Sequence, residues 1–162
     1  MATKNVEPGF VLPRTEWRRV LEETAVEVFS VMVGVAVAPA DHGSPSAMQI
    51  TGVVGIAGAI RANFILRCST ASAIKLASQM LGIEPDAPDA QTAACDALGE
   101  ICNIVAGYFK AKIGLGDACM LSVPTIITGQ DYRFCSRDSY ERMELSLLFE
   151  GETLAATLEV AQ

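Results

Sequence analysis

Side chains that dominate many active sites are scarce in this sequence. It holds a single histidine, His42, and five cysteines, none of them in C-x-x-C spacing. A zinc site needs clustered thiolates or imidazoles, and a catalytic thiol needs a neighbouring base, so neither is predicted. The odd number of cysteines also argues against a disulfide framework. We interpret them as small apolar packing residues, including Cys95 and Cys102, which share one face of a predicted helix.

Positive charge and long apolar segments are scarce as well. Lys and Arg number 12 against 19 Asp and Glu, which gives a net charge of −7 and argues against nucleic-acid binding. The most apolar run, residues 28–38, is well short of the roughly 20 residues that span a bilayer. Residues 1–8 are polar and lack the apolar segment of a signal peptide. We therefore expect a cytoplasmic protein without membrane insertion.

The sequence does have the composition of a folded domain. Hydrophobic residues make up 51% and charged residues 19%, so a sizeable core can form. No internal repeat or interdomain linker is evident. We expect one domain over residues 1–162, with residues 1–15 as a flexible N-terminal segment.

Hydrophobic periodicity indicates three helices, over residues 16 to about 37, 71–81 and 90–113. Ser69 or Thr70 is expected to cap the second helix and Gly82 to end it. Asp89 is placed to cap the third helix and Gly114 to end it. The third helix carries the longest helical signal in the chain.

Alternating apolar and polar residues indicate the strands. Residues 48–68 predict a hairpin with its turn at residues 55–58, and further strands are expected at 118–123, 125–128, 143–149 and 153–160. Helices and antiparallel hairpins occur in separate runs. The fold class is therefore predicted to be α+β, a layered antiparallel sheet with long helices packed on it.

A stripe of polar and small residues lies on the long predicted helix. Asp96, Glu100, Asn103 and Gly107 are separated by four, three and four residues, which places them on one helix face. Adjacent like charges and interior glycines, Gly99 included, do not favour helix stability. The stripe is either an ordinary solvated face or a functional one. In the second case a carboxylate would pair with a partner's cation, and a carboxamide would orient water.

The segment D-A-L-G-E-I-C-N-I-V-A-G, from Asp96 to Gly107, resembles the signature of the CheC/CheX/FliY chemotaxis phosphatases. Asp96, Glu100 and Asn103 match its first three elements, and Pro124 in L-S-V-P is the fourth. The order of the other segments is similar to the CheX branch. The first helix carries no second Glu/Asn motif, as in that branch, whereas Tyr108 replaces its usual small or polar residue.

The resemblance implies a CheX-like fold, a homodimer joined through its sheet, and hydrolysis of the aspartyl phosphate on a CheY-like response regulator. Carried onto this chain, Glu100 would bind the receiver's lysine and Asn103 would position the attacking water, while Asp96, Gly99 and Gly107 would belong to the docking face. Phosphoryl transfer depends mainly on positioning, so a carboxamide suffices. The chain would need no cofactor of its own, and magnesium would belong to the partner receiver domain.

Three alternatives remain open from the sequence. The chain could be a non-catalytic CheX-like binding module or adaptor for a receiver domain. It could instead be a small-molecule sensor that uses a cavity beneath the glycine-rich hairpin, for which no specific residues are evident. The third is an α+β domain whose polar stripe is merely solvated.

Overall fold

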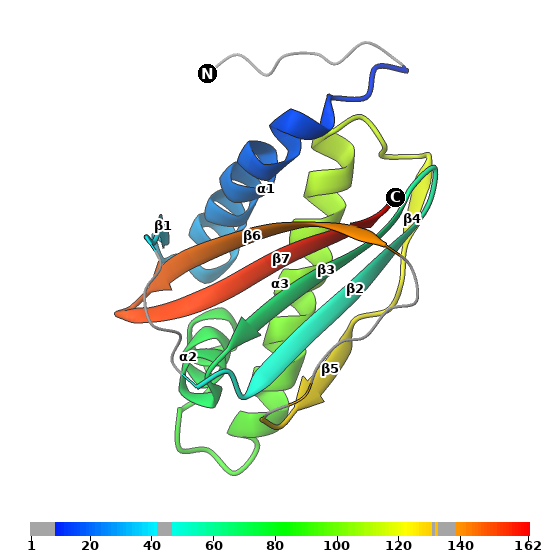
Figure 1. Ribbon diagram of the computed structural model, residues 1–162. Coiled ribbons are helices and arrows are strands. Elements are labelled where there is room, and N and C mark those ends of the chain that lie inside the picture. Colours follow the sequence, from blue (N-terminus) through cyan, green and yellow to red (C-terminus); the bar gives the residue numbers. More distant parts are fainter. Residues whose placement is uncertain (1–8, 42–46, 131, 133–138) are drawn as a thin grey trace.

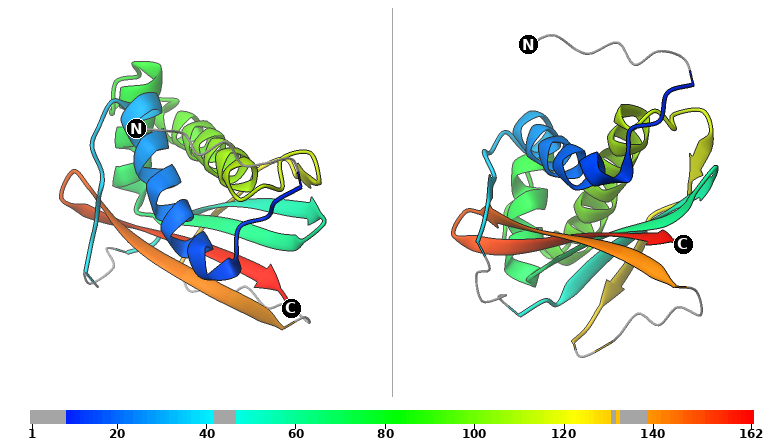
Figure 2. Two further views of the ribbon diagram at one scale, coloured as in Figure 1. Left: turned by 90° about the horizontal axis from the view of Figure 1, so that it is seen from above. Right: turned by 45° about the horizontal axis from the view of Figure 1, so that its top comes forward.

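The computed structural model describes residues 9–41, 47–130, 132 and 139–162. Within these ranges, an antiparallel sheet of seven strands carries the helices on one face (Figures 1 and 2). The strands are β1 Ala38–Pro39, β2 Ile50–Gly58, β3 Arg61–Cys68, β4 Cys119–Leu121, β5 Thr125–Thr128, β6 Tyr140–Phe149 and β7 Glu152–Ala161. Their order is β1-β6-β7-β3-β2-β4, and β5 pairs with β2 on the same side as β4.

The helices are α1 Arg14–Val28, its continuation η1 Phe29–Val33, α2 Thr70–Leu81 and α3 Ala90–Lys112. Figure 1 shows α3 running along the sheet behind β2, β3 and β7. The predicted α+β class is confirmed, and the alternation of apolar residues in β3 and β7 does place one side of each strand against the helices. The core includes Phe64, Leu66, Leu158 and, from α3, Phe109, whose ring meets Trp17 edge-on at 5.9 Å.

The first helix ends earlier than predicted. Its last turn widens into the π-helix η1, and Gly34 then takes the left-handed conformation with φ 73°, which ends the helix before the expected residue 37. Glycine adopts this conformation without the Cβ penalty that other residues meet. The apolar residues that follow therefore belong to the connection towards β1, where Ala38 and Pro39 pair with Leu148 and Leu147 of β6.

The hairpin turn was predicted three residues too early. Gly55 lies inside β2, opposite Asn63, and the strand continues to Gly58. Gly58 has a φ of 143°, and a Cβ there would collide with the carbonyl oxygen of Ala118, so glycine is required at this position. The backbone N–H and carbonyl of Gly55 both form hydrogen bonds with the distant residue Ser122, and these bonds keep Gly55 within the strand.

The helix caps were predicted with mixed success. Ser69 does cap α2, accepting a hydrogen bond from the Ser72 N–H at 3.0 Å, and Gly82 ends it with φ 68°. Asp89 occupies the N-cap position of α3, but its side chain accepts no capping hydrogen bond, so that prediction was wrong. Its backbone, at φ −99° and ψ 6°, is not in the extended conformation that side-chain capping usually requires. Gly114, with φ 89°, follows the end of α3 as expected.

The expected flexible segment, residues 1–15, is only partly within the described ranges. Residues 1–8 and His42 lie outside them. Of the remainder, Leu12 donates its N–H to the Ile113 carbonyl at 2.9 Å, and its own carbonyl accepts from the Trp17 indole at 2.8 Å. The chain is therefore held against the end of α3 just before α1 begins at Arg14. None of the helices in the described ranges is long and apolar enough to cross a bilayer.

Candidate functional site on α3

The polar stripe lies on the face of α3 that is turned away from the core. Asp96 and Glu100 are exposed, and Asn103 and Gly107 are half-buried. The opposite face is fully buried, with Leu98, Ile101, Val105 and Phe109 in the core. A single straight helix therefore brings the predicted residues together, one turn above the next.

The polar side chains of the stripe, Asp96, Glu100 and Asn103, have no hydrogen-bond or ion-pair partner among the residues that the structure describes. Lys110, in the last turn of α3, is directed elsewhere, because its ammonium donates to the carbonyl oxygens of Gly116 and Cys119. The stripe thus presents uncompensated negative charge and an available carboxamide to whatever docks on it.

Pro124, the fourth predicted element, is brought to the stripe by the β4–β5 edge. Its Cβ lies 3.4 Å from the position that a Cβ would take at Gly99, and Leu121 Cδ1 lies 3.6 Å from the corresponding position at Gly107. The segment from Leu121 to Pro124 consequently runs beside α3 in the opposite direction, from Gly107 of the stripe to Gly99 at its flank. Gly99 is buried in this contact, so any part it has in docking would be to seat Pro124.

The segment between β4 and β5 is a bulge at the sheet edge. In β2, Ile56 pairs with Leu121 and Val53 pairs with Thr125. Three steps along β2 therefore oppose four steps along the β4–β5 edge, so one residue is extra. Bulges of this kind bend a strand and redirect its side chains, and they are common beside functional sites. Pro124 is compatible with this place because it has no N–H to contribute to a ladder.

We compared the chain with known proteins once this geometry was established. Residues 50–147, more than half of the chain, match the family model for the chemotaxis phosphatase CheX. The chain belongs to the CheX family. The CheX protein of Thermotoga maritima, a CheY-P phosphatase, is 30% identical over 102 residues, which cover 62% of this chain and 64% of that protein. The resemblance in the α3 segment is thereby confirmed at the level of the family.

Solved structures confirm the CheX-like fold. A CheX–CheY complex with beryllium fluoride and magnesium from Borrelia burgdorferi matches with a TM-score of 0.76 at 20% identity, covering 92% of this chain and 100% of that chain. CheX from Desulfovibrio desulfuricans matches with a TM-score of 0.73 at 18% identity, covering 90% and 99%. A CheC-like protein from a Shewanella species matches with 0.76 at 13% identity, covering 93% and 100%.

Two buried cysteines of this CheX family member, Cys68 and Cys102, are poorly suited to act as nucleophiles. Burial raises the pKa of Cys68 to about 12, with a further contribution from the charge of Glu152. Burial also raises the pKa of Cys102, which is fully enclosed between α3 and β2. Both therefore remain protonated at neutral pH and act as packing residues. Within the described ranges, no group of three or more His, Cys, Asp and Glu side chains is placed to hold a metal ion.

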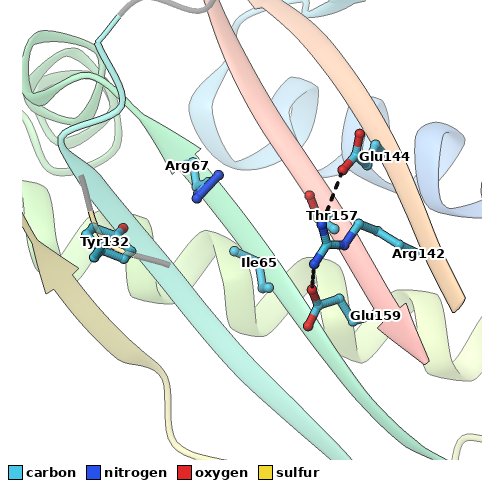
Figure 3. A pocket seen from close by; sticks show the side chains of 7 residues that line it. All are labelled: Ile65, Arg67, Tyr132, Arg142, Glu144, Thr157 and Glu159. Atoms are coloured by element: carbon cyan, nitrogen blue, oxygen red, sulfur yellow. Dashed lines mark hydrogen bonds and ion pairs between the residues drawn. The ribbon is translucent and has the colours of Figure 1, made fainter. Parts of the chain in front are cut away.

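A pocket of about 230 Å³ lies on the sheet face opposite the helices (Figure 3). Its charged groups largely satisfy one another. Arg142 contacts Glu159 at 2.5 Å and Glu144 at 4.0 Å, and the Arg67 guanidinium lies 6.0 Å from the centre of the Tyr132 ring. These residues are on the other side of the sheet from α3. The sensor alternative concerned a cavity beneath the glycine-rich hairpin, and this internally paired cluster does not test it.

Sequence reasoning missed two residues at the candidate site. Ser122 holds the bulge to β2, and Val123 projects from it with 83% of its surface exposed. The only local signal was the S-V-P run between two short strands, because the partner of Ser122, Gly55, is 67 residues away. Tyr108, 53% exposed, lies about 100° around the helix from Gly107, so it flanks the stripe rather than covering it.

Proposed function

We propose that this chain hydrolyses the aspartyl phosphate of a CheY-like receiver domain in two-component, chemotaxis-type signalling. The observation that supports the proposal most directly is that Glu100 and Asn103, on the outer face of α3, have no hydrogen-bond or ion-pair partner among the described residues. Pro124 packs at Gly99 on the same helix. Polar groups that serve the fold are normally paired within it, whereas these are available to a partner. Membership of a family of chemotaxis phosphatases agrees with that reading.

In this mechanism Glu100 binds the receiver, and Asn103 positions the water that attacks the phosphate. The Glu100 carboxylate would pair with the receiver's lysine beside the phosphorylated aspartate. The Asn103 carboxamide would enter the receiver's active site and hold a water in line with the phosphorus–oxygen bond. Water attacks phosphorus, the bond to the aspartate breaks, and the receiver recovers its free carboxylate as inorganic phosphate leaves. Because the transition state is loose, orientation matters more than proton abstraction.

The remaining groups fit supporting roles. Asp96 and Gly107 would lie in the docking face at the two ends of the stripe, and Gly99 would seat Pro124 against it. Magnesium would be held by the receiver, where it neutralises charge on the transferred group, and this chain would supply no metal ligand. A location in the cytoplasm, where receiver domains work, follows as part of the proposal.

The competing function is a CheX-like adaptor that binds a receiver without hydrolysing anything. It would use the same docking face, so binding alone does not discriminate. The test is to incubate the chain with several phosphorylated CheY-like receivers and magnesium, and to follow loss of the receiver's phosphate against receiver alone. Accelerated loss with at least one receiver is expected. Tight binding of a receiver with no acceleration would replace the phosphatase with the adaptor.

A homodimer joined through the sheet is also part of the proposal. The outer edge of β6 meets β1 only at Leu147 and Leu148 among the described residues. Residues 140–145 pair with β7 on their inner edge, but their outer edge has no neighbouring strand among the described residues. Such edges favour pairing with another chain. Sedimentation equilibrium at micromolar concentration should give twice the 17.2 kDa chain mass. A mass that stays at that of one chain would contradict the dimer without affecting the phosphatase.

A further inference from the structure

Two apolar side chains project from the β4–β5 edge into solvent. Met120 is 78% exposed and Val123 is 83% exposed. Single exposed apolar residues are common on protein surfaces and need no explanation. Val123 differs because it belongs to the bulge that packs against the polar stripe, next to Pro124, so it adjoins the candidate site. Met120 precedes Leu121 in β4, and because side chains alternate along a strand it is on the other face from the residue that packs at Gly107.

The position of Val123 along α3 follows from the contacts on either side of it. Leu121 packs at Gly107, and Pro124 packs at Gly99. Asn103 is four residues from each of these glycines, one helical turn from both. Val123, between Leu121 and Pro124, is therefore level with Asn103, on the side of the stripe that faces the sheet edge.

The bulge is held firmly enough to present this side chain in one place. Ser122 donates its N–H to the Gly55 carbonyl at 2.8 Å, and its hydroxyl accepts from the Gly55 N–H at 2.8 Å. The same hydroxyl contacts the Val123 carbonyl at 3.1 Å. Pro124 then fixes the next φ angle near −65°. Side chains that are pre-organised in this way lose little conformational entropy when a partner covers them.

We infer that the bulge of Ser122, Val123 and Pro124 is the apolar half of the docking surface for the receiver domain, with Val123 as its anchor. The inference rests on the proposed function. It adds Val123 as a residue that strengthens receiver binding, next to Glu100 and Asn103, which take part in the hydrolysis. Apolar anchors at the centre of an interface carry much of the binding energy, while flanking polar groups fix orientation. The partner is a receiver because Val123 is level along α3 with Asn103, whose carboxamide must reach the receiver's phosphate.

Val31 offers a matched control for Val123. It is the same residue type, is 75% exposed, and lies on η1 at the end of α1 rather than on the β4–β5 edge. The experiment measures the dissociation constant of wild type, Val123→Ala, Val123→Ile and Val31→Ala for a receiver loaded with beryllium fluoride and magnesium. Val123→Ala should bind about tenfold more weakly, as expected for burial of two methyl groups. Val123→Ile and Val31→Ala should bind like the wild type.

A kinetic measurement separates anchoring from catalysis. At saturating phosphorylated receiver, Val123→Ala should turn over within about twofold of wild type, because an anchor acts on the ground state and transition state alike. Equal binding by Val123→Ala and wild type would overturn the inference, and the phosphatase would still stand if Asn103→Ala lost turnover. Equal weakening by Val31→Ala would also overturn it, since the effect would not be local. If the wild type neither binds nor dephosphorylates any receiver, both proposals fall.

Discussion

The start of α2 and the outer face of α3 use similar polar side chains in opposite ways. At α2, the Glu152 carboxylate accepts hydrogen bonds from the hydroxyls of Ser69, at 2.5 Å, and Ser72, and Lys75 lies 4.0 Å from it. On α3, Glu100 and Asn103 contact no polar partner in the described ranges. Both sites lie on helices that pack on the same sheet face.

The difference separates groups that stabilise the fold from groups that are kept for a partner. The α2 cluster joins the β6–β7 hairpin to a helix N-terminus, where a carboxylate is favoured by the exposed N–H groups. The α3 stripe makes no such stabilising hydrogen bonds among the described residues. Its glycine and its like charges reduce helix stability instead. Substitutions in the two regions should therefore have opposite signatures, with loss of stability at α2 and loss of function at α3.

The largest effect is expected from Asn103→Ala on turnover. Loss of the water-orienting carboxamide should lower kcat by about a hundredfold to a thousandfold, the size seen when one pre-organised polar group is removed from a transition state. Thermal unfolding should be nearly unchanged because Asn103 has no described partner to lose. Single-turnover assays with phosphorylated receiver and circular dichroism measure the two quantities. Near-normal hydrolysis by the folded variant would remove the catalytic role.

Glu100→Gln should act mainly on binding. It keeps the shape of the side chain and removes the charge, which should weaken the receiver complex by at least about 2 kcal/mol, or about 30-fold, since a buried lysine would lose its partner. KM should rise more than kcat falls. A receiver with its lysine changed to Glu, combined with Glu100→Lys, should regain part of the lost affinity. Unchanged KM and kcat in Glu100→Gln would leave this residue as a charge on a solvated helix.

The stripe could be predicted from sequence because its residues are neighbours on one helix. Spacings of four, three and four are sufficient to place Asp96, Glu100, Asn103 and Gly107 on a common face, and the structure keeps α3 regular throughout. The strands β3, β6 and β7 could also be predicted, because apolar residues recur at every second position in each of them. Burial follows that alternation in β6, and it departs from it at Ile65 of β3 and Glu159 of β7, which are buried as well. The local spacing of residues was therefore sufficient to predict both the fold class and the residues of the candidate site.

Features that depend on distant partners could not be predicted in this way. Gly55 was expected in a turn, but pairing with Ser122 across the sheet keeps it in β2. The bulge that sets Val123 level with Asn103 along α3 follows from the registers in which β2 pairs with β4 and with β5, which no single segment encodes. Asp89 was misjudged for a related reason, because its backbone conformation is set by the loop before α3.

In the α2 region, Glu152→Gln should cost stability and spare function. Hydrogen bonds from Ser69, then Ser72, lower the pKa of Glu152 from its ordinary value of 4.5. Loss of the charged acceptor should reduce the free energy of unfolding by about 1–3 kcal/mol at pH 7. Because the ionised form is the one stabilised, its contribution is complete above about pH 4.5 and disappears as the pH falls through the lowered value.

Urea unfolding of wild type and Glu152→Gln across this pH range tests the assignment. The difference between the two proteins should be constant near neutrality and shrink towards zero in acid. Receiver dephosphorylation at pH 7 should be unaffected, because the cluster is not on the α3 stripe. A difference that persists below the pKa of Glu152 would mean that the loss comes from packing rather than from the carboxylate.

The smallest effect, and the one that tests the comparison most finely, is expected from Gly107→Ala. A Cβ at this position would meet only Leu121 Cδ1, at 3.6 Å, which is an ordinary contact. Alanine is favoured over glycine in a helix interior by about 1 kcal/mol, so the free protein should become more stable by up to that amount. If a receiver must approach the backbone closely at Gly107, the same substitution should weaken receiver binding severalfold.

Gly52→Ala provides the contrasting control, since a Cβ there would lie 2.6 Å from the buried Cys102 Sγ and should destabilise the fold. A glycine kept for packing loses stability on substitution by alanine, whereas a glycine kept for docking gains stability and loses affinity. Only the second pattern at Gly107 is consistent with selection for a partner at the expense of the helix. If Gly107→Ala raised the stability and left receiver affinity undiminished, the receiver would not approach α3 closely at Gly107. The docking face would then be confined to the turns around Glu100 and Asn103.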